Sequence, residues 1–235
     1  MNRVPKIIHS NYKYSYDKLD IEIKRNIKKN LLINSNYDFK YYSDNDIDNF
    51  FKEYFGKDNY VFKSYKLLNP KYKEAIYDLF KYCVLLIHGG IFIDINVQLK
   101  INFDSIIDKD TLCILDFPYK NGVSKDNLSF SNWILIFSKN HPYLNIIIQN
   151  ITNNIINKKI PKCEPSYIEC NKQIIPKLTG EDIFSKSINR SISKYGVLYK
   201  NIDYKIIANK YFNSNKYAIS YNQDKIHNIE NDLYL

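Results

Sequence analysis

The sequence has 235 residues, of which 45% are hydrophobic and 15% aromatic, so the chain can bury a sizeable core and is not a disordered tail. Six glycines and seven prolines exclude a collagen-like or low-complexity chain. The formal net charge of +9 favours polyanions, phosphorylated ligands or anionic surfaces as partners. The lysines are spread along the chain without a recognised DNA- or RNA-binding motif. We therefore expect no nucleic-acid partner, and a phosphate-bearing small substrate suits the charge equally well.

Asn, Ile, Lys and Tyr dominate the composition, which is typical of AT-rich coding, so we give their counts little functional weight. No CxxC pair occurs among the four cysteines, and a structural zinc site is not expected. Cys83 lies in an apolar helical pattern and is predicted to be in the core. Cys163 and Cys170 could pair if the chain were exported, and free thiols are the default.

No segment of the sequence has the pattern of a membrane anchor. The first 14 residues lack the apolar stretch of a secretory signal, and the longest apolar run is interrupted by His88 and a glycine pair. We therefore expect a soluble protein, without a transmembrane segment, in the cytoplasm or another reducing compartment.

Strand-like and helix-like patterns alternate along the chain, which predicts an α/β fold. In chain order the predicted elements are a strand over 6–10, a helix over 16–34, a strand and turn within 37–47, a helix over 45–55 capped by Ser43, a helix over 70–87, a strand over 91–99, a strand over 111–117, a helix over 141–156, a helix over 179–192, and short strands within 204–212 and 216–221. No internal repeat and no Ser/Gly linker divides the chain.

The clearest helix has apolar residues at i, i+3, i+4 and i+7 between Pro70 and Ile87. Pro70 suits its first turn, and Gly89-Gly90 is a natural stop. The period of the apolar pattern then changes from 3.6 to two, which predicts the strand over 91–99.

Two polar residues, Asp94 and Asn96, interrupt this apolar strand. On a strand they would point to the same side, where their oxygens could hold a divalent cation together with a diphosphate. They could equally be ordinary turn residues. Asp78 and Lys81 lie one helical turn apart and could face the same pocket, or they could form an exposed ion pair that contributes little.

Residues 78–96, DLFKYCVLLIHGGIFIDIN, resemble the signature of the DxD-containing glycosyltransferases related to yeast initiating α-1,6-mannosyltransferases and capsular polysaccharide transferases (glycosyltransferase family 32-like). Direct matches to that signature are Asp78, Tyr82, Leu85, Gly89, Gly90 and Asp94. Four other segments also resemble the family and occur in the same order along the chain as in the family. They are residues 4–12 and 36–50, before this signature, and 130–144 and 178–184, after it. The resemblance therefore covers most of the chain.

The resemblance implies a GT-A-like, Rossmann-type nucleotide-sugar-binding fold with a mixed central sheet flanked by helices. Residues 1–235 would form a single domain, with a nucleotide-sugar-binding half over about 1–100 and an acceptor-side half over about 101–235. The implied activity is the transfer of a hexose from a UDP- or GDP-linked sugar to a hydroxyl of a glycan or protein. Members of this family retain the anomeric configuration and use Mn²⁺ or Mg²⁺.

The resemblance also implies roles for individual residues. Asp94 corresponds to the first acid of the DxD motif, which contacts the metal or the donor ribose, and Asn96 takes the place of the second acid, a metal ligand. Asp78 would bind hydroxyls of the donor hexose, so that Asp78 and Asp94 are the expected catalytic residues. Lys81 stands where the family has an arginine, near the sugar or phosphate.

Two further donor-binding residues follow from the same resemblance. Tyr12 occupies the position of an aromatic residue that stacks on the nucleotide base, and Asn132 matches a family position near the donor. His9 is expected to orient the loop after the first strand, and His141 to mark a helix entry with Pro142.

The chain also departs from the family pattern. Asn96 supplies a neutral carbonyl oxygen, which lowers the expected metal affinity, and Lys81 lacks the bidentate fork of arginine. A second hypothesis is therefore a catalytically degenerate protein that binds a nucleotide sugar or glycan without turnover.

Overall fold

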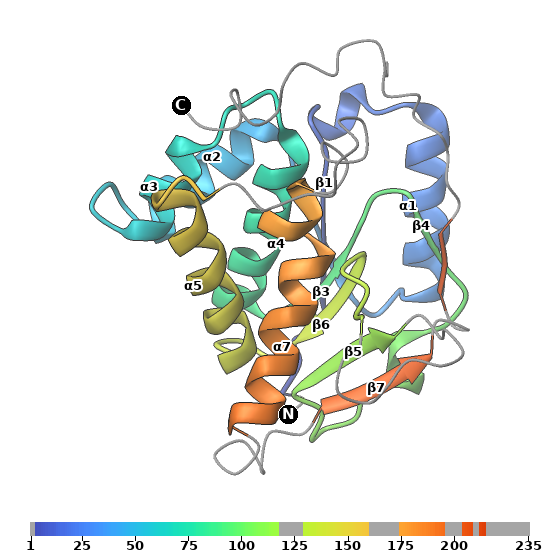
Figure 1. Ribbon diagram of the computed structural model, residues 1–235. Helices are drawn as coiled ribbons and strands as arrows, with labels where there is room; N and C mark the ends of the chain where they lie inside the picture. Colours follow the sequence, from blue (N-terminus) through green and yellow to red (C-terminus); the bar gives the residue numbers. More distant parts are fainter. Residues whose placement is uncertain (1–2, 118–128, 160–173, 196–203, 209–211, 215–235) are drawn as a thin grey trace, which may run out of the picture.

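The computed structural model describes residues 3–117, 129–159, 174–195, 204–208 and 212–214, and its centre is a mixed six-stranded sheet (Figure 1). The strand order is β2-β1-β3-β6-β5-β7. The strands are β1 (Ile7–Asn11), β2 (Asp38–Tyr42), β3 (Gly90–Ile93), β5 (Cys113–Phe117), β6 (Ile134–Phe137) and β7 (Tyr204–Ala208). A separate antiparallel pair joins β4 (Val97–Leu99) to β8 (Phe212–Ser214). This confirms the predicted α/β class with a mixed central sheet.

Strand direction determines which loops meet. β1 runs parallel to both β2 and β3, with Ile8 opposite Ile91 and His9 opposite Phe92. The loops that follow β1 and β3 therefore leave the sheet at the same edge, side by side. β3 and β6 are antiparallel, and so are β5 and β6, whereas β5 and β7 are parallel.

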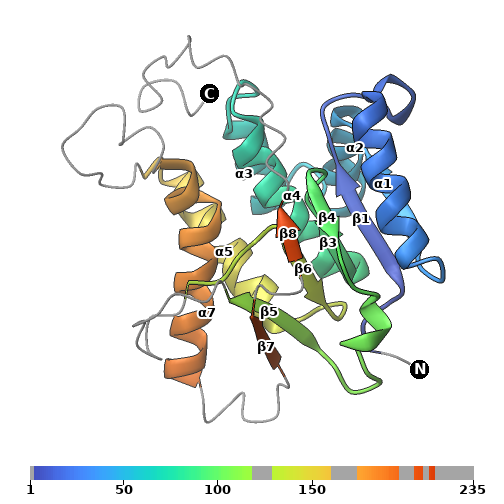
Figure 2. The same ribbon diagram turned by 90° about the vertical axis from the view of Figure 1, so that its right-hand side faces the viewer.

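Helices cover both faces of the sheet (Figure 1 and Figure 2). On one face lie α4 (Lys73–His88), α5 (Pro142–Ile156) and α7 (Glu181–Tyr195), with α2 (Asp44–Tyr54) and α3 (Tyr60–Leu67) beside them. On the other face lies α1 (Ile21–Ile33), after a short 3-10 helix at Tyr16–Lys18. A second 3-10 helix spans Phe103–Ser105.

Alternation along β3 divides the core between the two faces. Phe92 packs into the cluster formed with α4, α5 and α7, whereas Ile91 and Ile93 pack into the opposite cluster with β4 and the Phe103 segment. This is the period-two pattern that the sequence predicted for residues 91–93.

The central helix, α4, is buried on most of its surface, because ten of its side chains between Ala75 and Leu85 are buried. Among them is Cys83, which confirms its predicted place in the core. Gly89 and Gly90 both have positive φ angles, of 67° and 100°. A Cβ on Gly89 would lie 2.6 Å from the backbone nitrogen of Lys139, so the close approach of two chain segments requires glycine there.

Several predicted boundaries differ from the structure. α4 begins at Lys73 instead of Pro70, because Asn69 accepts hydrogen bonds from the backbone nitrogens of Lys71 and Tyr72 and closes a turn. α3 and β6 were not predicted. The predicted strand over 216–221, the residues 209–211, and Cys163 with Cys170 lie outside the described residues.

Helix caps are encoded locally. Ser43 caps α2 in a reciprocal capping box with Asp46, as the sequence predicted for its N-terminus. His141 caps α5, since its ring nitrogen Nδ1 accepts a hydrogen bond from the backbone of Tyr143 and Pro142 occupies the first turn. In the part of the chain that the structure describes, no helix has the length and apolarity needed to cross a bilayer.

Candidate functional site

A pocket of about 170 Å³ opens at the carboxyl edge of β1 and β3, next to α4. In open α/β sheets this edge is where ligands bind. The side chains that line it are Asn11, Tyr12, Glu74, Tyr77, Asp78, Lys81, Asp94, Ile95 and Asn96. The structure therefore brings together five of the six site residues predicted from the sequence: Tyr12, Asp78, Lys81, Asp94 and Asn96.

The first wall of the pocket, which we call the α4 wall, consists of Asp78 and Lys81 with their partners Asn132 and Thr179. The Lys81 ammonium lies 2.8 Å from Oδ1 of Asp78 and donates to the backbone oxygen of Asn132 at 3.1 Å. The side chains of Asp78 and Lys81 are only 12% and 5% exposed. The pair is therefore buried, and the alternative of an exposed surface ion pair is wrong.

Asp78 has partners on both of its carboxylate oxygens. Oδ1 accepts from the side-chain amide of Asn132 at 3.3 Å as well as from Lys81, and Oδ2 accepts from the hydroxyl of Thr179 at 3.1 Å. Asn132 also donates to the hydroxyl oxygen of Tyr82 at 3.2 Å. The predicted donor-binding residue Asn132 thus lies behind the pocket, as a partner of its lining.

The close approach of Thr179 depends on the next residue. A Cβ on Gly180 would lie 2.9 Å from the backbone of Pro176 and 3.2 Å from Oδ2 of Asp78. Glycine at this position lets the turn before α7, which carries Thr179, approach the carboxylate. The resemblance over residues 178–184 indicated that this segment matters, without indicating that Thr179 bonds Asp78.

The second wall, which we call the loop wall, consists of Asn11, Tyr12, Asp94 and Asn96. The predicted strand over 91–99 is interrupted here, which corrects the sequence prediction. The backbone nitrogen of Asp94 donates to the oxygen of Trp133, and the nitrogen of Val97 then donates to the oxygen of Asp94 at 2.9 Å. A turn, and not a continuous strand, therefore places Asp94 and Asn96 on the same pocket.

Buried asparagines of α1 hold this turn from behind. The side-chain amide of Asn26 donates to the backbone oxygens of Ile95 and Val97, both at 3.0 Å. Asn30, one turn later, donates to Val97 at 2.7 Å and accepts from the backbone nitrogen of Leu99 at 2.8 Å. Asn26 and Asn30 therefore have a structural role, which is to fix the turn that carries Asp94 and Asn96.

Charge is distributed unequally over the pocket. Desolvation by the surrounding protein raises the pKa of Asp94 to about 6 against the opposing charge of Lys81, and the Asp78 carboxylate raises it further. Lys81 Nζ lies 3.7 Å from Oδ1 of Asp94. Burial acts to lower the pKa of Lys81, but the charges of Asp78 and Asp94 outweigh it and raise that pKa. At neutral pH both Lys81 and Asp94 are therefore charged.

Asp94 is the open carboxylate of the pocket. Its side chain is 41% exposed, compared with 12% for Asp78. On the same wall, the side-chain nitrogen of Asn11 is buried and has no hydrogen-bond partner among the described residues. Such a buried, unpaired donor is rare in folded proteins. Nothing in the sequence distinguished Asn11 from other strand-end asparagines.

Tyr12 follows β1 and forms the rim of the loop wall. Its ring packs against the cluster of Leu19, Ile27 and Ile95, and lies 6.0 Å from the ring of Tyr14 in an edge-to-face arrangement. One face of an aromatic ring at this rim is suited to stacking on a planar ligand.

The oxygen atoms of the loop wall suit a hard divalent ion, but the protein offers few of them. Asp94 and Asn96 offer one carboxylate and one amide oxygen, and Mg²⁺ or Mn²⁺ commonly takes its remaining ligands from water and substrate phosphates. Within the described ranges, no group of three or more His, Cys, Asp and Glu side chains is arranged to hold a metal ion. A metal here would therefore take most of its ligands from water and a diphosphate.

His9 and His88 lie side by side, and their contacts are with the protein's own strands and helices. His9 is fully buried, with its ring nitrogens 3.1 Å from the Tyr42 hydroxyl and 3.0 Å from the backbone oxygen of Gly89. Desolvation lowers its pKa to about 4, so the ring is neutral at pH 7. These contacts join β1 to β2 and to the end of α4, and the role of His9 in orienting the loop after the first strand stays a prediction. His88, at the end of α4, stacks on His9 at 6.1 Å.

No protein-family model matches the sequence. The chain is 26% identical over 152 residues to an uncharacterized glycosyltransferase of Acanthamoeba polyphaga mimivirus, which is 63% of this chain and 55% of that protein. The chain thus spans about half the length of the curated relative that it matches.

Two solved structures share the architecture. The PaToxG glycosyltransferase superposes with a TM-score of 0.58 at 16% identity, over 84% of this chain and 73% of that one. The ligand-free glycosyltransferase domain from the YGT toxin superposes with a TM-score of 0.54 at 10% identity, over 91% and 81%. The fold is that of glycosyltransferases. The mixed sheet flanked by helices, expected from the resemblance, is therefore confirmed.

Proposed function

We propose that the protein is a glycosyltransferase that moves a hexose from a nucleotide-diphosphate sugar, UDP- or GDP-linked, to a hydroxyl of a glycan or protein. The observation that carries this proposal is the ionised, 41% exposed carboxylate of Asp94. It faces a pocket at the carboxyl edge of a glycosyltransferase-fold sheet, beside a buried lysine. In this proposal the whole chain, residues 1–235, acts as one domain. The pairing of β3 with β6, and of β4 with β8, supports this by joining the two halves.

The loop wall receives the donor in this proposal. Asp94 and Asn96 would hold Mn²⁺ or Mg²⁺, and the ion would supply positive charge beside the leaving diphosphate. Tyr12 stacks on the base. The unpaired amide nitrogen of Asn11 donates a hydrogen bond to the donor, which satisfies a group that otherwise has no partner among the described residues.

The α4 wall supplies a fixed positive charge. Lys81 stabilises the charge that develops on the diphosphate, and because two acceptors already hold its ammonium group, little reorganisation accompanies the reaction. Asp78 orients Lys81 and Asn132, and contacts a hexose hydroxyl only through the small exposed part of its carboxylate. The transfer retains the anomeric configuration, with the leaving diphosphate accepting the proton of the attacking hydroxyl.

Ligand-induced stabilisation tests this proposal. We expect UDP- or GDP-hexoses to raise the melting temperature of the full chain in the presence of Mn²⁺, and to raise it less in EDTA. In the same assay Asp94→Ala is expected to remove the metal-dependent part of the shift. An exposed aspartate on another surface provides the matched control, Asp58→Ala, which should leave the shift unchanged. A chain that no nucleotide sugar stabilises, with or without metal, contradicts the proposal.

A second function is favoured by one observation, the neutral oxygen of Asn96. A chain with a single carboxylate at this position could bind a nucleotide sugar or glycan without turning it over. Release of free nucleoside diphosphate in the presence of candidate acceptors separates the two, because a binding protein would be stabilised by the donor and release none.

A further inference from the structure

Exposed apolar side chains are concentrated in one segment of the chain, which consists of α1, the 3-10 helix Tyr16–Lys18 and the residues just before it. Among the described residues, eight large hydrophobic side chains are exposed, and five of them fall within residues 14–33. These five are Tyr14 (48%), Tyr16 (42%), Ile21 (58%), Leu32 (69%) and Ile33 (36%). Exposed apolar side chains that lie near one another on a solvent-facing surface are typical of an interaction site.

The same surface is basic. Residues 12–35 contain six basic and three acidic side chains, a net charge of +3. On α1 the exposed positions recur at helical spacing, so that Lys28 and Lys29 lie between the exposed apolar residues Ile21 and Leu32. We define the α1 surface as Tyr14, Tyr16, Ile21, Lys28, Lys29 and Leu32.

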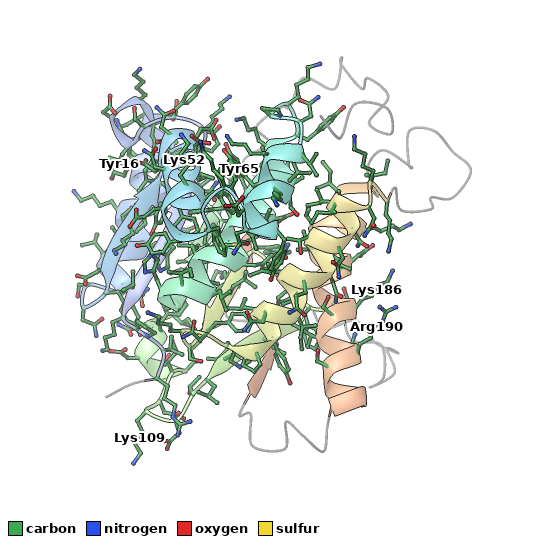
Figure 3. All side chains as sticks on the ribbon, turned by 90° about the vertical axis from the view of Figure 1, so that its left-hand side faces the viewer. Tyr16, Lys52, Tyr65, Lys109, Lys186 and Arg190 are labelled. Atoms are coloured by element: carbon green, nitrogen blue, oxygen red, sulfur yellow. The ribbon has the colours of Figure 1, made fainter. Side chains whose placement is uncertain are left out.

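A groove runs along this surface. It has a volume of about 500 Å³ and is lined by Tyr16, Lys24, Lys28, Leu31, Leu32, Ser35, Tyr37 and Phe39. Its lining combines two lysines with aliphatic and aromatic side chains. Figure 3 shows Tyr16 at the edge of the molecule.

We propose that the α1 surface docks on a membrane surface that contains anionic phospholipids. Lysine side chains would contact lipid phosphates, while Leu32, Ile21 and the two tyrosines enter the boundary between headgroups and acyl chains. Nucleic acid would satisfy the lysines but would leave the aliphatic side chains Ile21 and Leu32 unburied. The mixture of exposed aliphatic, tyrosine and lysine side chains therefore favours a lipid surface.

Docking in this way has a consequence for the pocket. Tyr14, on the α1 surface, contacts Tyr12, on the pocket rim, with their ring centroids 6.0 Å apart. Lys13, between them, lies 4.7 Å from the centroid of the Tyr14 ring. A membrane bound to the α1 surface would lie next to the pocket, and acceptors presented at that membrane would be close to the donor.

Vesicle co-sedimentation of the full chain tests the proposal. We expect binding to phosphatidylcholine vesicles that contain phosphatidylserine, weak or no binding to pure phosphatidylcholine, and weaker binding as the salt concentration rises. Lys28→Glu/Lys29→Glu should lower the partition coefficient by at least about 25-fold, and Leu32→Ser by about tenfold. All three side chains are exposed, so both variants are expected to fold.

The matched control is Lys109→Glu/Lys186→Glu, which changes the net charge by the same amount at exposed positions that Figure 3 shows well apart from Tyr16. This control should lower vesicle binding much less than Lys28→Glu/Lys29→Glu. An equal loss in both double variants would overturn the α1 surface as the site, because net charge alone would then explain binding. Absence of binding to phosphatidylserine vesicles at low salt, or binding to duplex RNA without vesicle binding, would also overturn the proposal. Donor binding in the pocket is measured separately and does not depend on either outcome.

Discussion

The two walls of the pocket differ in how far their polar groups are satisfied within the protein. On the α4 wall, Asp78 has partners on both oxygens and the Lys81 ammonium has two close acceptors. On the loop wall, Asp94 is 41% exposed and the side-chain nitrogen of Asn11 lacks a partner among the described residues. The polar groups of the α4 wall thus have their partners within the protein, whereas those of the loop wall can still bind a ligand. Substitutions on the first should change stability most, and those on the second should change binding.

The largest effect is expected from Asp78→Asn. This substitution leaves the buried Lys81 charge with only Asp94, 3.7 Å away, as a counter-ion. Breaking a buried ion pair by removing one partner typically costs about 3–5 kcal/mol, and we expect a loss of that size in the free energy of unfolding. Urea unfolding at pH 7 measures it.

The paired replacement Asp78→Leu/Lys81→Met is the control, because it removes both charges. It should recover most of the stability while leaving the protein inactive. If Asp78→Asn costs less than about 1 kcal/mol, the pair does not hold the α4 wall together and the comparison of the two walls fails.

Asp94→Asn is expected to have the opposite combination of effects. Without the carboxylate, transfer should fall by about a hundredfold or more, as when a group that stabilises the transition state is removed. Stability at pH 7 should rise only slightly, because the raised pKa of Asp94, about 6, makes the ionised form destabilising in the folded state, whereas solvent around this 41% exposed carboxylate screens much of that cost. Steady-state kinetics and urea unfolding in EDTA test the two parts.

The effect of Asp94→Asn on stability should also depend on pH. Because the folded protein binds the Asp94 proton more tightly than the unfolded chain, wild-type stability should fall as pH rises from about 4 to about 6. The advantage of Asp94→Asn should therefore be present above pH 6 and disappear near pH 4. Wild-type kcat/KM, which reports the free enzyme, should rise through about pH 6, since the ionised carboxylate is the active form. A variant that is less stable than wild type at pH 7 contradicts this account.

Asn26→Ala tests how the loop wall is held. It removes two hydrogen bonds to the backbone of the turn that carries Asn96, and leaves the oxygen of Ile95 without this donor. We expect a loss of about 2 kcal/mol in unfolding free energy, with weaker donor binding. Asn36→Ala, at an exposed position past the end of α1, should cost much less. Equal losses would show that the buried asparagines have no special role.

Local patterns predicted the proximity of Asp78 and Lys81 and the strand that follows α4, but not the turn that ends this strand. Asp78 and Lys81 are three residues apart on a strongly periodic helix, so their proximity follows from helix geometry. The change of period after Gly89-Gly90 predicted β3 for the same reason. β6 was missed because Ile134–Phe137 is a short apolar run, which periodicity cannot assign to a strand or a helix.

The remaining parts of the site depend on contacts between distant segments. Thr179 and Asp78 are 101 residues apart, and Asn26 lies 69 residues before its acceptor Ile95. A single sequence contains no signal for such pairs, since either residue type is also common at exposed positions. The unpaired amide of Asn11 is likewise a property of the folded environment and not of its local sequence.

Asn96→Asp is expected to have a smaller effect, in the direction of a gain. A second carboxylate beside Asp94 raises the negative charge available to a divalent ion, so Mn²⁺ affinity should rise by about tenfold. Titration of Mn²⁺ with a nucleotide sugar, followed by the melting temperature, measures this. A parallel gain in turnover favours a weakened enzyme, and no turnover in either form favours the binding protein. Asn96→Ala is the control and should weaken the metal dependence.

The smallest change in stability is expected from Asn11→Leu, which separates binding from folding on the loop wall. Asn11 is buried, and its amide nitrogen is unsatisfied by the described residues, so an apolar side chain of similar size should leave the free energy of unfolding unchanged or raise it by about 1 kcal/mol. Donor affinity should nevertheless fall by about tenfold, because the bound ligand loses a buried hydrogen bond. Isothermal titration and urea unfolding of the same preparation give both numbers. A variant that is destabilised by more than about 1 kcal/mol with unchanged donor affinity would show that Asn11 serves the fold, and that the capacity of the loop wall resides in Asp94 and Asn96 alone.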